Sequence, residues 1–388
     1  MSKIKKTLFI ILANLIFFLL IEVSLTFFFF FHSSNYYGPL ARLFLSNKDI
    51  PKKTIMYKIK FDKFTQMYLP GTYEFKNTIN KVNEFGFLGQ KVDIANKKNC
   101  RLIALGGSTT AGLESKETYP KNLEKRLNKN DINCDVLNFG FSGKALNYLE
   151  KILVTEAIKF SPNIIAIMSN RNATMYDSFT TSAVASDVIK SKFELIVYKI
   201  KSFLFLELMS YRFLNLTYNR LISLFLKDEN KIKSPFNPKN FHSVKYFENG
   251  YRDQIMRINS FCKANDIKLL LIKQAFFINL NKQKVLNQLT KKQLIEKLKN
   301  YENEKSPFSK KDLFWMYTNA ILNKSLDEAQ NLDRSIVIID PTTKLYSKKK
   351  EKYFQEDGLH LKDSGNKIIA ETFFNTLINK KLVKTQKK

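Results

Sequence analysis

A serine in the first third of the chain and a histidine close to its end have surroundings that suggest chemistry. Ser108 lies in LGGSTTAG, where Gly106 and Gly107 permit a sharp turn that would expose the hydroxyl. Asp357 lies three residues before His360 in DGLHL. A serine nucleophile needs an imidazole to accept its proton, and the imidazole needs a carboxylate on its other nitrogen. These residues could therefore form a Ser-His-Asp triad.

Rival motifs are few. The chain has three histidines, and His32 borders an apolar N-terminal stretch while His242 lies in an irregular one, so His360 is the candidate base. The GGS turn lacks the Gly-Lys-Ser/Thr of a Walker A loop and the GxGxxG spacing of a dinucleotide site. No CxxC is present, so neither a metal nor a cofactor is expected. The alternative for DGLHL is a surface turn that caps a helix.

Short apolar runs that alternate with helical patterns would position these residues. The runs are RLIALG, DVLNF, NIIAIMS, IKLLLIK and SIVIID, at 101–106, 135–139, 163–169, 267–273 and 335–340. Runs that are apolar on both strand faces predict a parallel sheet covered by helices on both sides. A last helix is expected to begin after Asp363, with this residue as its N-cap.

Four blocks of the chain, in order, resemble the SGNH, or GDSL-type, hydrolase superfamily of bacterial serine esterases. The likeness covers about residues 100–379, without the insertions. GGSTTAG resembles the nucleophile block at Ser108, with Gly107 in place of the usual Asp, as in GGST-type members. The closing DGLHL block is intact. VNEFGFLGQ, at 82–90, is similar to the lead-in of membrane-anchored GGST-type relatives.

The two middle blocks imply where an oxyanion would bind. NFGFSG resembles the glycine block and carries the family's oxyanion-hole glycine onto Gly143. SNRNA resembles the Asn block and carries the oxyanion-hole amide onto Asn172. The family usually has Gly before this Asn and Asp after it, whereas this chain has Arg171 and Ala173, so Asn170 is an alternative donor. The spacing favours Asn172, because each block then follows a successive strand.

The resemblance implies a three-layer α/β/α, flavodoxin-like fold with a mostly parallel five-stranded sheet. It also implies that Ser108 attacks an ester carbonyl while His360 takes its proton and Asp357 orients the ring. The backbone N–H groups of Ser108 and Gly143 and the Asn172 amide would bind the oxyanion. Water or a sugar hydroxyl would then release the acyl group, and the motifs do not separate a hydrolase from a transferase. An α/β-hydrolase is disfavoured because the second glycine of GxSxG is missing.

The N-terminal stretch is expected to be a transmembrane helix that anchors the chain. Residues 7–31 are almost entirely apolar, and a helix of this length spans about 37 Å. Lys3, Lys5 and Lys6 precede it, so the positive-inside rule keeps the N-terminus cytoplasmic and sends the remainder outward. The alternative, a cleaved signal peptide, would have a shorter apolar region that ends in small residues.

The expected organisation has three parts, namely a signal anchor at 1–32, a juxtamembrane lead-in at 33–98 and the hydrolase-like domain at 99–388. Residues 174–243 interrupt the α/β alternation and are expected to form a helical insertion. Within it, the stretch 193–226 is amphipathic. This stretch could pack as core, cover the active site or rest on the membrane surface.

Composition and charge narrow the function classes. The chain has 388 residues, of which 44% are hydrophobic, with only 12 Gly and 9 Pro, so a substantial core is expected and collagen-like or disordered classes are excluded. A net charge of +29 would favour nucleic-acid binding, but a chain that faces outward meets no chromosome, so no nucleic-acid partner is expected. The excess is mostly Lys spread along the chain, which compositional drift explains best. Attraction to anionic lipid headgroups or acidic envelope polymers is the alternative.

Three cysteines cannot all pair. Cys100 and Cys134 each open an apolar run, so on neighbouring parallel strands their thiols would lie at the same end of the sheet. In an oxidising compartment this placement predicts a Cys100–Cys134 disulfide. Two buried, inert thiols are the alternative, and Cys262 is left unpaired.

These inferences converge on a membrane-anchored serine esterase that faces the periplasm or the exterior. The expected substrate is an O-acylated envelope glycan or lipid, because the anchor holds the domain at the membrane. The alternative from another class is a non-catalytic envelope assembly or glycan-binding protein with the same fold, which the altered Asn block favours. The acyl group, the acceptor and the oligomeric state do not follow from the sequence.

Overall fold

The computed structural model describes most of the chain. It covers residues 12–14, 16–24, 55–56, 67–75, 78–89, 92–94, 97–173, 245–277, 285–346 and 350–384. The predicted insertion at 174–243, with its amphipathic stretch, lies outside these residues. The predicted division into anchor, lead-in and catalytic domain therefore stays a prediction.

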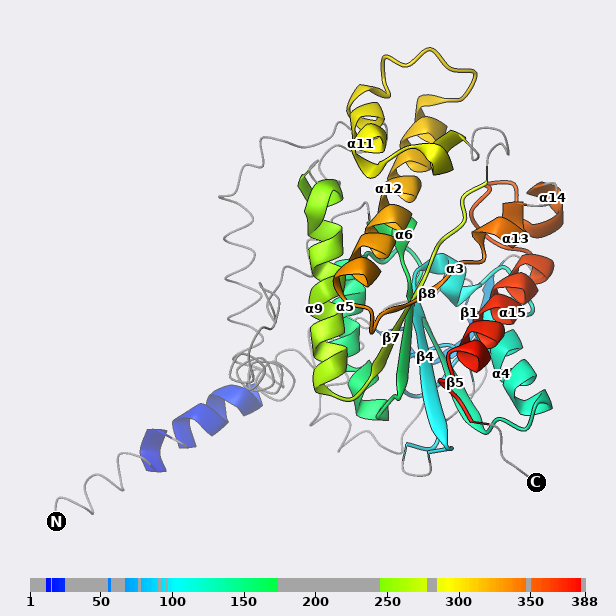
Figure 1. Cartoon of the computed structure of the whole chain (residues 1–388). Coiled ribbons are helices and arrows are strands. Elements are labelled where there is room, and N and C mark those ends of the chain that lie inside the picture. Colours follow the sequence, from blue (N-terminus) through cyan, green and yellow to red (C-terminus); the bar gives the residue numbers. More distant parts are fainter. Residues whose placement is uncertain are drawn as a thin grey trace.

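Five parallel strands form the central sheet, as the apolar runs predicted (Figure 1). They are β4 (Cys100–Gly106), β5 (Cys134–Gly140), β6 (Ile164–Met168), β7 (Lys268–Ile272) and β8 (Val337–Ile339). Their order across the sheet is β5-β4-β6-β7-β8. The chain therefore changes direction across the sheet between β4 and β6. Open α/β sheets bind ligands at such a switch point, at the carboxyl ends of the strands.

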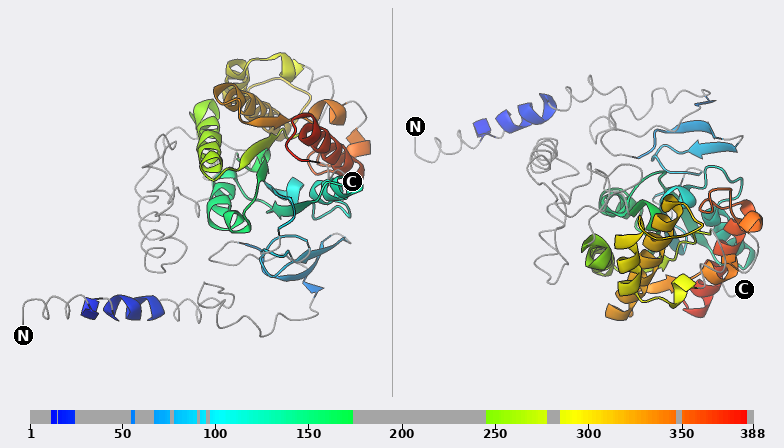
Figure 2. Two further views of the ribbon diagram at one scale, coloured as in Figure 1. Left: turned by 60° about the horizontal axis from the view of Figure 1, so that its bottom comes forward. Right: turned by 90° about the horizontal axis from the view of Figure 1, so that it is seen from above.

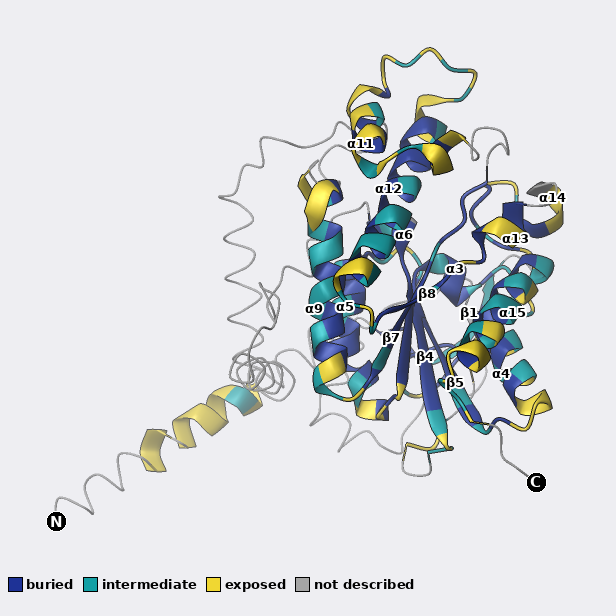
Figure 3. Cartoon of the chain, viewed as in Figure 1, coloured by how far each residue is buried: buried dark blue, intermediate teal, exposed yellow. Residues whose placement is uncertain are grey.

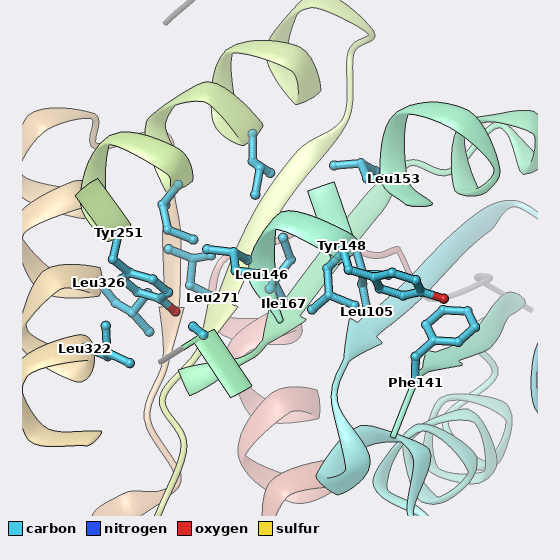
Figure 4. Packing of buried hydrophobic residues seen from close by; sticks show 14 of the residues in the cluster. Leu105, Phe141, Leu146, Tyr148, Leu153, Ile167, Tyr251, Leu271, Leu322 and Leu326 are labelled. Atoms are coloured by element: carbon cyan, nitrogen blue, oxygen red, sulfur yellow. The ribbon is translucent and has the colours of Figure 1, made fainter. Parts of the chain in front are cut away.

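Each strand of this sheet buries side chains on both faces. On β4, Ile103 and Leu105 join one core cluster, and Leu102 and Ala104 join the other; all four are fully buried. Figure 3 shows this as a dark sheet inside a shell of half-buried and exposed helices. Figure 4 shows the first cluster, in which strand residues such as Leu105 meet side chains of the covering helices. Two apolar faces explain the continuous runs in the sequence, because neither face of the sheet contacts water.

Helices cover both faces of the sheet and make it the middle of three layers (Figures 1 and 2). On one face lie α5 (Leu146–Thr155), α9 (Tyr251–Ala264) and α12 (Lys310–Leu332). On the other lie α4 (Tyr119–Lys129) and α15 (Asp363–Asn379). Shorter or peripheral helical elements are α3 (Ser108–Ala111), η1 (Ala157–Phe160), α6 (Asn170–Ala173), η4 (Tyr246–Gly250), α11 (Lys291–Asn300), α13 (Thr342–Tyr346) and α14 (Lys350–Tyr353).

The start of α15 corrects one expectation. Lys362, not Asp363, is the N-cap, and it makes no side-chain capping hydrogen bond. Asp363 is the first helical residue, and its carboxylate accepts a hydrogen bond of 3.2 Å from the backbone N–H of Glu117. The carboxylate therefore ties the last helix to the segment before α4 instead of capping its own helix, a partner that only the tertiary fold supplies.

The lead-in contributes a small second sheet that packs on the edge of the domain (Figure 2). It consists of β1 (Ile55–Met56), β2 (Gly71–Phe75) and β3 (Thr78–Val82). Beyond β3, Leu88 forms a bridge to Asn138 on the edge strand β5. Gly86 has φ +83°, and a Cβ there would lie 2.7 Å from both Met67 Cβ and the Tyr68 carbonyl oxygen. Only glycine fits this close approach, which packs the turn at Gly86 against Met67 and Tyr68.

Cys100 and Cys134 pair across β4 and β5, as predicted. They are register partners at the first residue of each strand, and their Cα atoms are 4.5 Å apart in a disulfide. Cys262 is a free, fully buried thiol on α9, and burial raises its pKa far above the ordinary value. A buried, neutral thiol of this kind packs as a small apolar side chain.

The N-terminal residues 12–14 and 16–24 are helical. Within the described part of the chain, no helix combines the length and the apolar character that crossing a bilayer requires. The predicted span at 7–31 extends beyond the described residues at both ends, so the anchor stays a prediction.

A buried arginine fixes the amino end of the sheet. Arg101 on β4 is fully buried, and its Nε and Nη2 donate to Asp135 Oδ2 on β5 at 3.1 and 3.0 Å. Nη1 donates to the carbonyl of Phe160, and Nη2 also donates to the carbonyl of Asp93. A buried guanidinium is tolerated only when its donors are satisfied and its charge is paired.

We expect Asp135→Asn to lower the free energy of unfolding by about 2–3 kcal/mol, because it leaves the Arg101 charge buried without a counter-ion. The matched control is Lys98→Met, since Lys98 pairs with the same carboxylate at 3.4 Å but from an exposed position. That change should cost less than about 0.5 kcal/mol. Urea unfolding measures both, and equal losses in the two variants would contradict the importance of the buried pair.

Candidate active site

The predicted site residues gather at the carboxyl edge of the sheet. Ser108 follows β4, Gly143 follows β5, and Asn172 lies in α6 just after β6. Asp357 and His360 lie in the loop between α14 and α15. Three successive strand ends and one distant loop thus converge at the switch point of the sheet, where such folds bind ligands.

The turn that carries Ser108 depends on two glycines. A Cβ at Gly106 would lie 2.6 Å from the carbonyl oxygen of Met168 on the neighbouring strand, so β4 can reach its end beside β6 only without a side chain there. A Cβ at Gly107 would lie 2.4 Å from Asn172 Nδ2. The glycine at 107, where the SGNH blocks usually have Asp, therefore leaves the room that the Asn172 amide occupies next to the serine.

Ser108, His360 and Asp357 are hydrogen-bonded in series. His360 Nε2 lies 2.8 Å from Ser108 Oγ, and His360 Nδ1 lies 2.5 Å from Asp357 Oδ2. The other carboxylate oxygen, Asp357 Oδ1, accepts from the backbone N–H groups of Leu359 and His360 at 2.9 and 3.0 Å. One carboxylate therefore shapes the DGLHL turn and contacts the partly exposed His360 ring at the same time.

The environment of Asp357 keeps its carboxyl group ionised. Partial burial on its own would raise the pKa, but the hydrogen bond from the His360 side chain and the backbone N–H of Leu359 favour the charged form. The balance holds the Asp357 pKa well below its ordinary value. A permanently charged carboxylate at Nδ1 leaves Nε2 as the ring nitrogen that faces the serine and stabilises an imidazolium when it forms.

A hydrogen-bonded clamp holds the DGLHL loop in reach of the serine. Ser115, just beyond the nucleophile turn, donates from Oγ to the carbonyl of Leu361 at 2.8 Å. Asn366 on α15 donates to Ser115 Oγ at 3.0 Å, and its own Oδ1 accepts from the N–H of Tyr119. Because Ser115, Leu361 and Asn366 are buried and their hydrogen bonds join the two segments, packing sets the distance between Ser108 and His360.

The structure separates the two candidate asparagines. Asn170 is fully buried, and both polar atoms of its side-chain amide are hydrogen-bonded. Nδ2 donates to Asn323 Oδ1, and Oδ1 accepts from the Tyr251 hydroxyl. Asn172 is partly exposed, and within the described part of the chain its side-chain amide has no hydrogen-bond partner. Its Nδ2 also lies against Gly107. The geometry thus places the Asn172 amide against Gly107, the residue before the serine, and holds the Asn170 amide in buried hydrogen bonds.

Gly143 adopts a backbone conformation that suits a donor loop. Its φ is +74°, in the left-handed region, and no atom of the described residues lies within 4 Å of where a Cβ would be. The site therefore has open space on that side of the loop. A non-glycine residue would meet backbone strain here rather than a clash.

The structure also shows a supporting residue that the motifs do not reveal. Tyr68, in the lead-in, accepts a hydrogen bond of 2.7 Å from the N–H of Ser142, and its ring lies 5.1 Å from that of Phe141. Burial raises its pKa far above the ordinary value, so the phenol stays neutral. The lead-in thereby supports the loop that carries Gly143. No sequence signal marks Tyr68, because its partner is a backbone group far along the chain.

Comparisons with known proteins find similarity to solved structures at low sequence identity only. No model of a known protein family and no curated protein matches the chain. Similar solved structures include the lipase/acylhydrolase from Enterococcus faecalis, which is 13% identical with a TM-score of 0.41 over 74% of this chain and 100% of that chain. A family 3 carbohydrate esterase from Clostridium thermocellum is 11% identical (TM-score 0.38; 74% and 99%). A GDSL-like lipase from Bacteroides thetaiotaomicron is 12% identical (TM-score 0.37; 72% and 88%).

Fold and site together define an α/β protein with the geometry of a serine hydrolase. A serine, an imidazole and a carboxylate lie in series at the carboxyl edge of a parallel sheet with helices on both faces. The five-stranded parallel sheet is the one that the apolar runs of the sequence predict.

We expect substitution of Asn172 to lower activity and substitution of Asn170 to lower stability. Asn172→Ala should lower kcat for an activated ester by about 10²–10³ and leave the melting temperature unchanged, because it removes a donor without breaking a described contact. Asn170→Ala should lower the free energy of unfolding by about 2–3 kcal/mol, because it leaves buried partners unsatisfied. Steady-state kinetics and thermal unfolding separate the two effects. A stable Asn170→Ala protein without turnover would identify Asn170 as the donor instead.

Proposed function

We propose that this chain is an SGNH-type serine esterase, with Ser108 as nucleophile, His360 as general base and Asp357 as the residue that orients the ring. The observation that carries the proposal is the 2.8 Å contact between His360 Nε2 and Ser108 Oγ, with Asp357 at 2.5 Å on the other ring nitrogen. A nucleophile, a base and an orienting group within hydrogen-bond reach are the arrangement that acyl transfer through serine requires.

The first half of the reaction forms an acyl-enzyme. Ser108 Oγ attacks the ester carbonyl carbon as its proton passes to His360 Nε2, and the carbonyl oxygen takes up the negative charge. The imidazolium is stabilised by the ionised Asp357 carboxylate. The C–O bond to the alcohol then breaks, and His360 returns the proton to the leaving alkoxide. The acyl group remains bound to Ser108 Oγ as an ester.

The oxyanion of each tetrahedral intermediate would be bound by the N–H groups of Ser108 and Gly143 and by the Asn172 amide. Ser108 is the first residue of α3. The first backbone hydrogen bonds of this helix are donated by Thr110 and Ala111, so the N–H of Ser108 lies before them at the helix N-terminus. Donors of this kind, fixed before the charge develops, contribute about 3 kcal/mol each to the transition state.

The second half releases the acyl group to an acceptor. With water as acceptor, His360 takes a proton from the water as it attacks the acyl carbon, and the products are a carboxylic acid and free Ser108. With a sugar hydroxyl as acceptor, the same steps transfer the acyl group. The triad serves both outcomes, because the base acts on any O–H placed at the acyl carbon.

The proposed location is the outer side of the cytoplasmic membrane, with an O-acylated envelope glycan or lipid as substrate. Two features support this location. The N-terminal stretch has the length, the apolar composition and the preceding lysines of a signal anchor. The Cys100–Cys134 disulfide fits an oxidising compartment. A non-catalytic glycan-binding protein of the same fold is the second candidate, favoured by the departures on either side of Asn172.

The labelling of the full chain by a fluorophosphonate probe tests the esterase proposal against the binding-protein alternative. The wild type should react at one serine, because the base at His360 activates Ser108. Ser108→Ala should not react, and Asp357→Asn should react at least about 10³-fold more slowly. Labelling is read by intact mass. A folded wild type that stays unlabelled, or equal labelling of Ser108→Ala, would overturn the proposal.

The topology has its own test, in which the native cysteines give little background because Cys262 is buried and the other two are paired. Lys129→Cys introduces a thiol at an exposed position on α4, and Lys3→Cys introduces one before the apolar stretch. In intact spheroplasts an impermeant maleimide should label Lys129→Cys, whereas Lys3→Cys should need lysis. The reverse pattern would place the domain in the cytoplasm.

A further inference from the structure

A buried glutamine contacts both of the turns that carry the proposed oxyanion donors Ser108 and Asn172. Gln274 follows β7, and only 5% of its surface is exposed. Its Nε2 donates to Thr109 Oγ1 at 2.9 Å, and its Oε1 accepts from the backbone N–H of Asn170 at 3.0 Å. Thr109 directly follows Ser108, and Asn170 begins the short helix that contains Asn172. One side chain thus connects the nucleophile turn to the Asn172 turn.

The glutamine is itself held by a cluster of amides from α12. The backbone carbonyl oxygen of Gln274 accepts from the side-chain amides of Asn319 and Asn323 at 2.9 and 3.0 Å. The backbone N–H of Gln274 donates to Asn323 Oδ1 at 3.2 Å. Asn170 Nδ2 donates to the same Asn323 oxygen at 2.5 Å, and the Tyr251 hydroxyl donates to Asn170 Oδ1 at 3.2 Å. A buried polar cluster with this many mutual contacts is rigid and has one arrangement.

The position of this cluster matters because Ser108 and Asn172 lie on different strand ends. The two donors stabilise one oxygen only if their separation is fixed to within about 0.5 Å. The sheet alone sets the strands side by side, but each turn extends past the last ladder hydrogen bond. Gln274 spans that gap with both of its polar atoms, one on each turn.

We propose that Gln274 is a positioning residue that holds the Asn172 amide at oxyanion-hole distance from the Ser108 N–H. It acts through Thr109 and Asn170 and does not touch the reacting atoms. The inference rests on the proposed function, and it adds the buried residue on which the alignment of that site depends.

Kinetics of the full chain with p-nitrophenyl acetate test this role. Gln274→Met keeps the length of the side chain and removes both contacts, and it should lower kcat by about 10- to 100-fold with KM changed by less than about 3-fold. A purely structural role would not produce energetic coupling between Gln274→Met and Asn172→Ala, so this coupling is the decisive measurement. In an Asn172→Ala background, where the donor is already absent, the same change should cost less than about 3-fold in kcat.

The matched control is Gln254→Met. Gln254 on α9 is equally buried and donates to Glu150 at 2.8 Å, but it contacts neither turn, so kcat should stay within about 2-fold of the wild type. Should Gln274→Met not fold, the isosteric Thr109→Val removes one of the two contacts and should show the same coupling to Asn172→Ala in smaller degree.

The kcat values are expressed per folded molecule, so that a loss of folded protein is not mistaken for a loss of activity. A kcat loss on Gln274→Met that is the same with and without Asn172 would overturn the positioning role, and so would an unchanged kcat. A wild type that neither hydrolyses the ester nor reacts with the fluorophosphonate would instead overturn the proposed function.

Discussion

The hydrogen bond between His360 and Ser108 joins residues 252 positions apart in the chain, and most of the fold serves to make that contact possible. The serine is fixed by the end of a central strand, where Gly106 allows β4 to lie against β6. The histidine is fixed by the loop before α15, which Ser115 and Asn366 hold from the side of the nucleophile. Neither residue depends on a free loop for its position, so the contact is preorganised rather than induced.

Buried polar side chains lie near this contact, and the need to pair them explains the architecture at the carboxyl edge. A buried amide without partners costs about 1–3 kcal/mol, so each such residue must be matched when the chain folds. Gln274 and Asn170 meet that requirement with one another and with α12. Asn172 is partly exposed at the edge of the site, and its side-chain amide has no hydrogen-bond partner among the described residues. An unmatched group among matched ones is where function is expected.

Much of the fold could be predicted from the sequence, because its signals are local. The runs that became β4 to β7 were predicted to within two residues, since strands buried on both faces must be continuously apolar. The run at 335–340 gave only a three-residue strand at Val337–Ile339. Local motifs also singled out Ser108, His360 and Asp357, which the structure brings into hydrogen-bond contact. The disulfide followed from the register of two adjacent strands. Asp363 was wrongly predicted as an N-cap because its real partner, Glu117, lies far away in the sequence.

What could not be predicted are the residues that act through distant partners. Tyr68 binds the N–H of Ser142, and Gln274 binds Thr109 and Asn170, and neither residue lies in a motif or an unusual composition. A single sequence carries no information on such pairs, because any tyrosine or glutamine in an apolar setting looks the same. The choice between Asn170 and Asn172 was open for the same reason, since it depends on which amide is already satisfied.

The central claim is that Ser108 is activated by His360 and that its oxyanion donors are already in place. It is tested most directly by a crystal structure of the full chain after reaction with a phosphonate ester. The account predicts phosphorus bonded to Ser108 Oγ, with the phosphoryl oxygen about 2.7–3.1 Å from the N–H groups of Ser108 and Gly143 and from Asn172 Nδ2. Phosphorus on any other residue, or a phosphoryl oxygen that points away from these three donors, would contradict it.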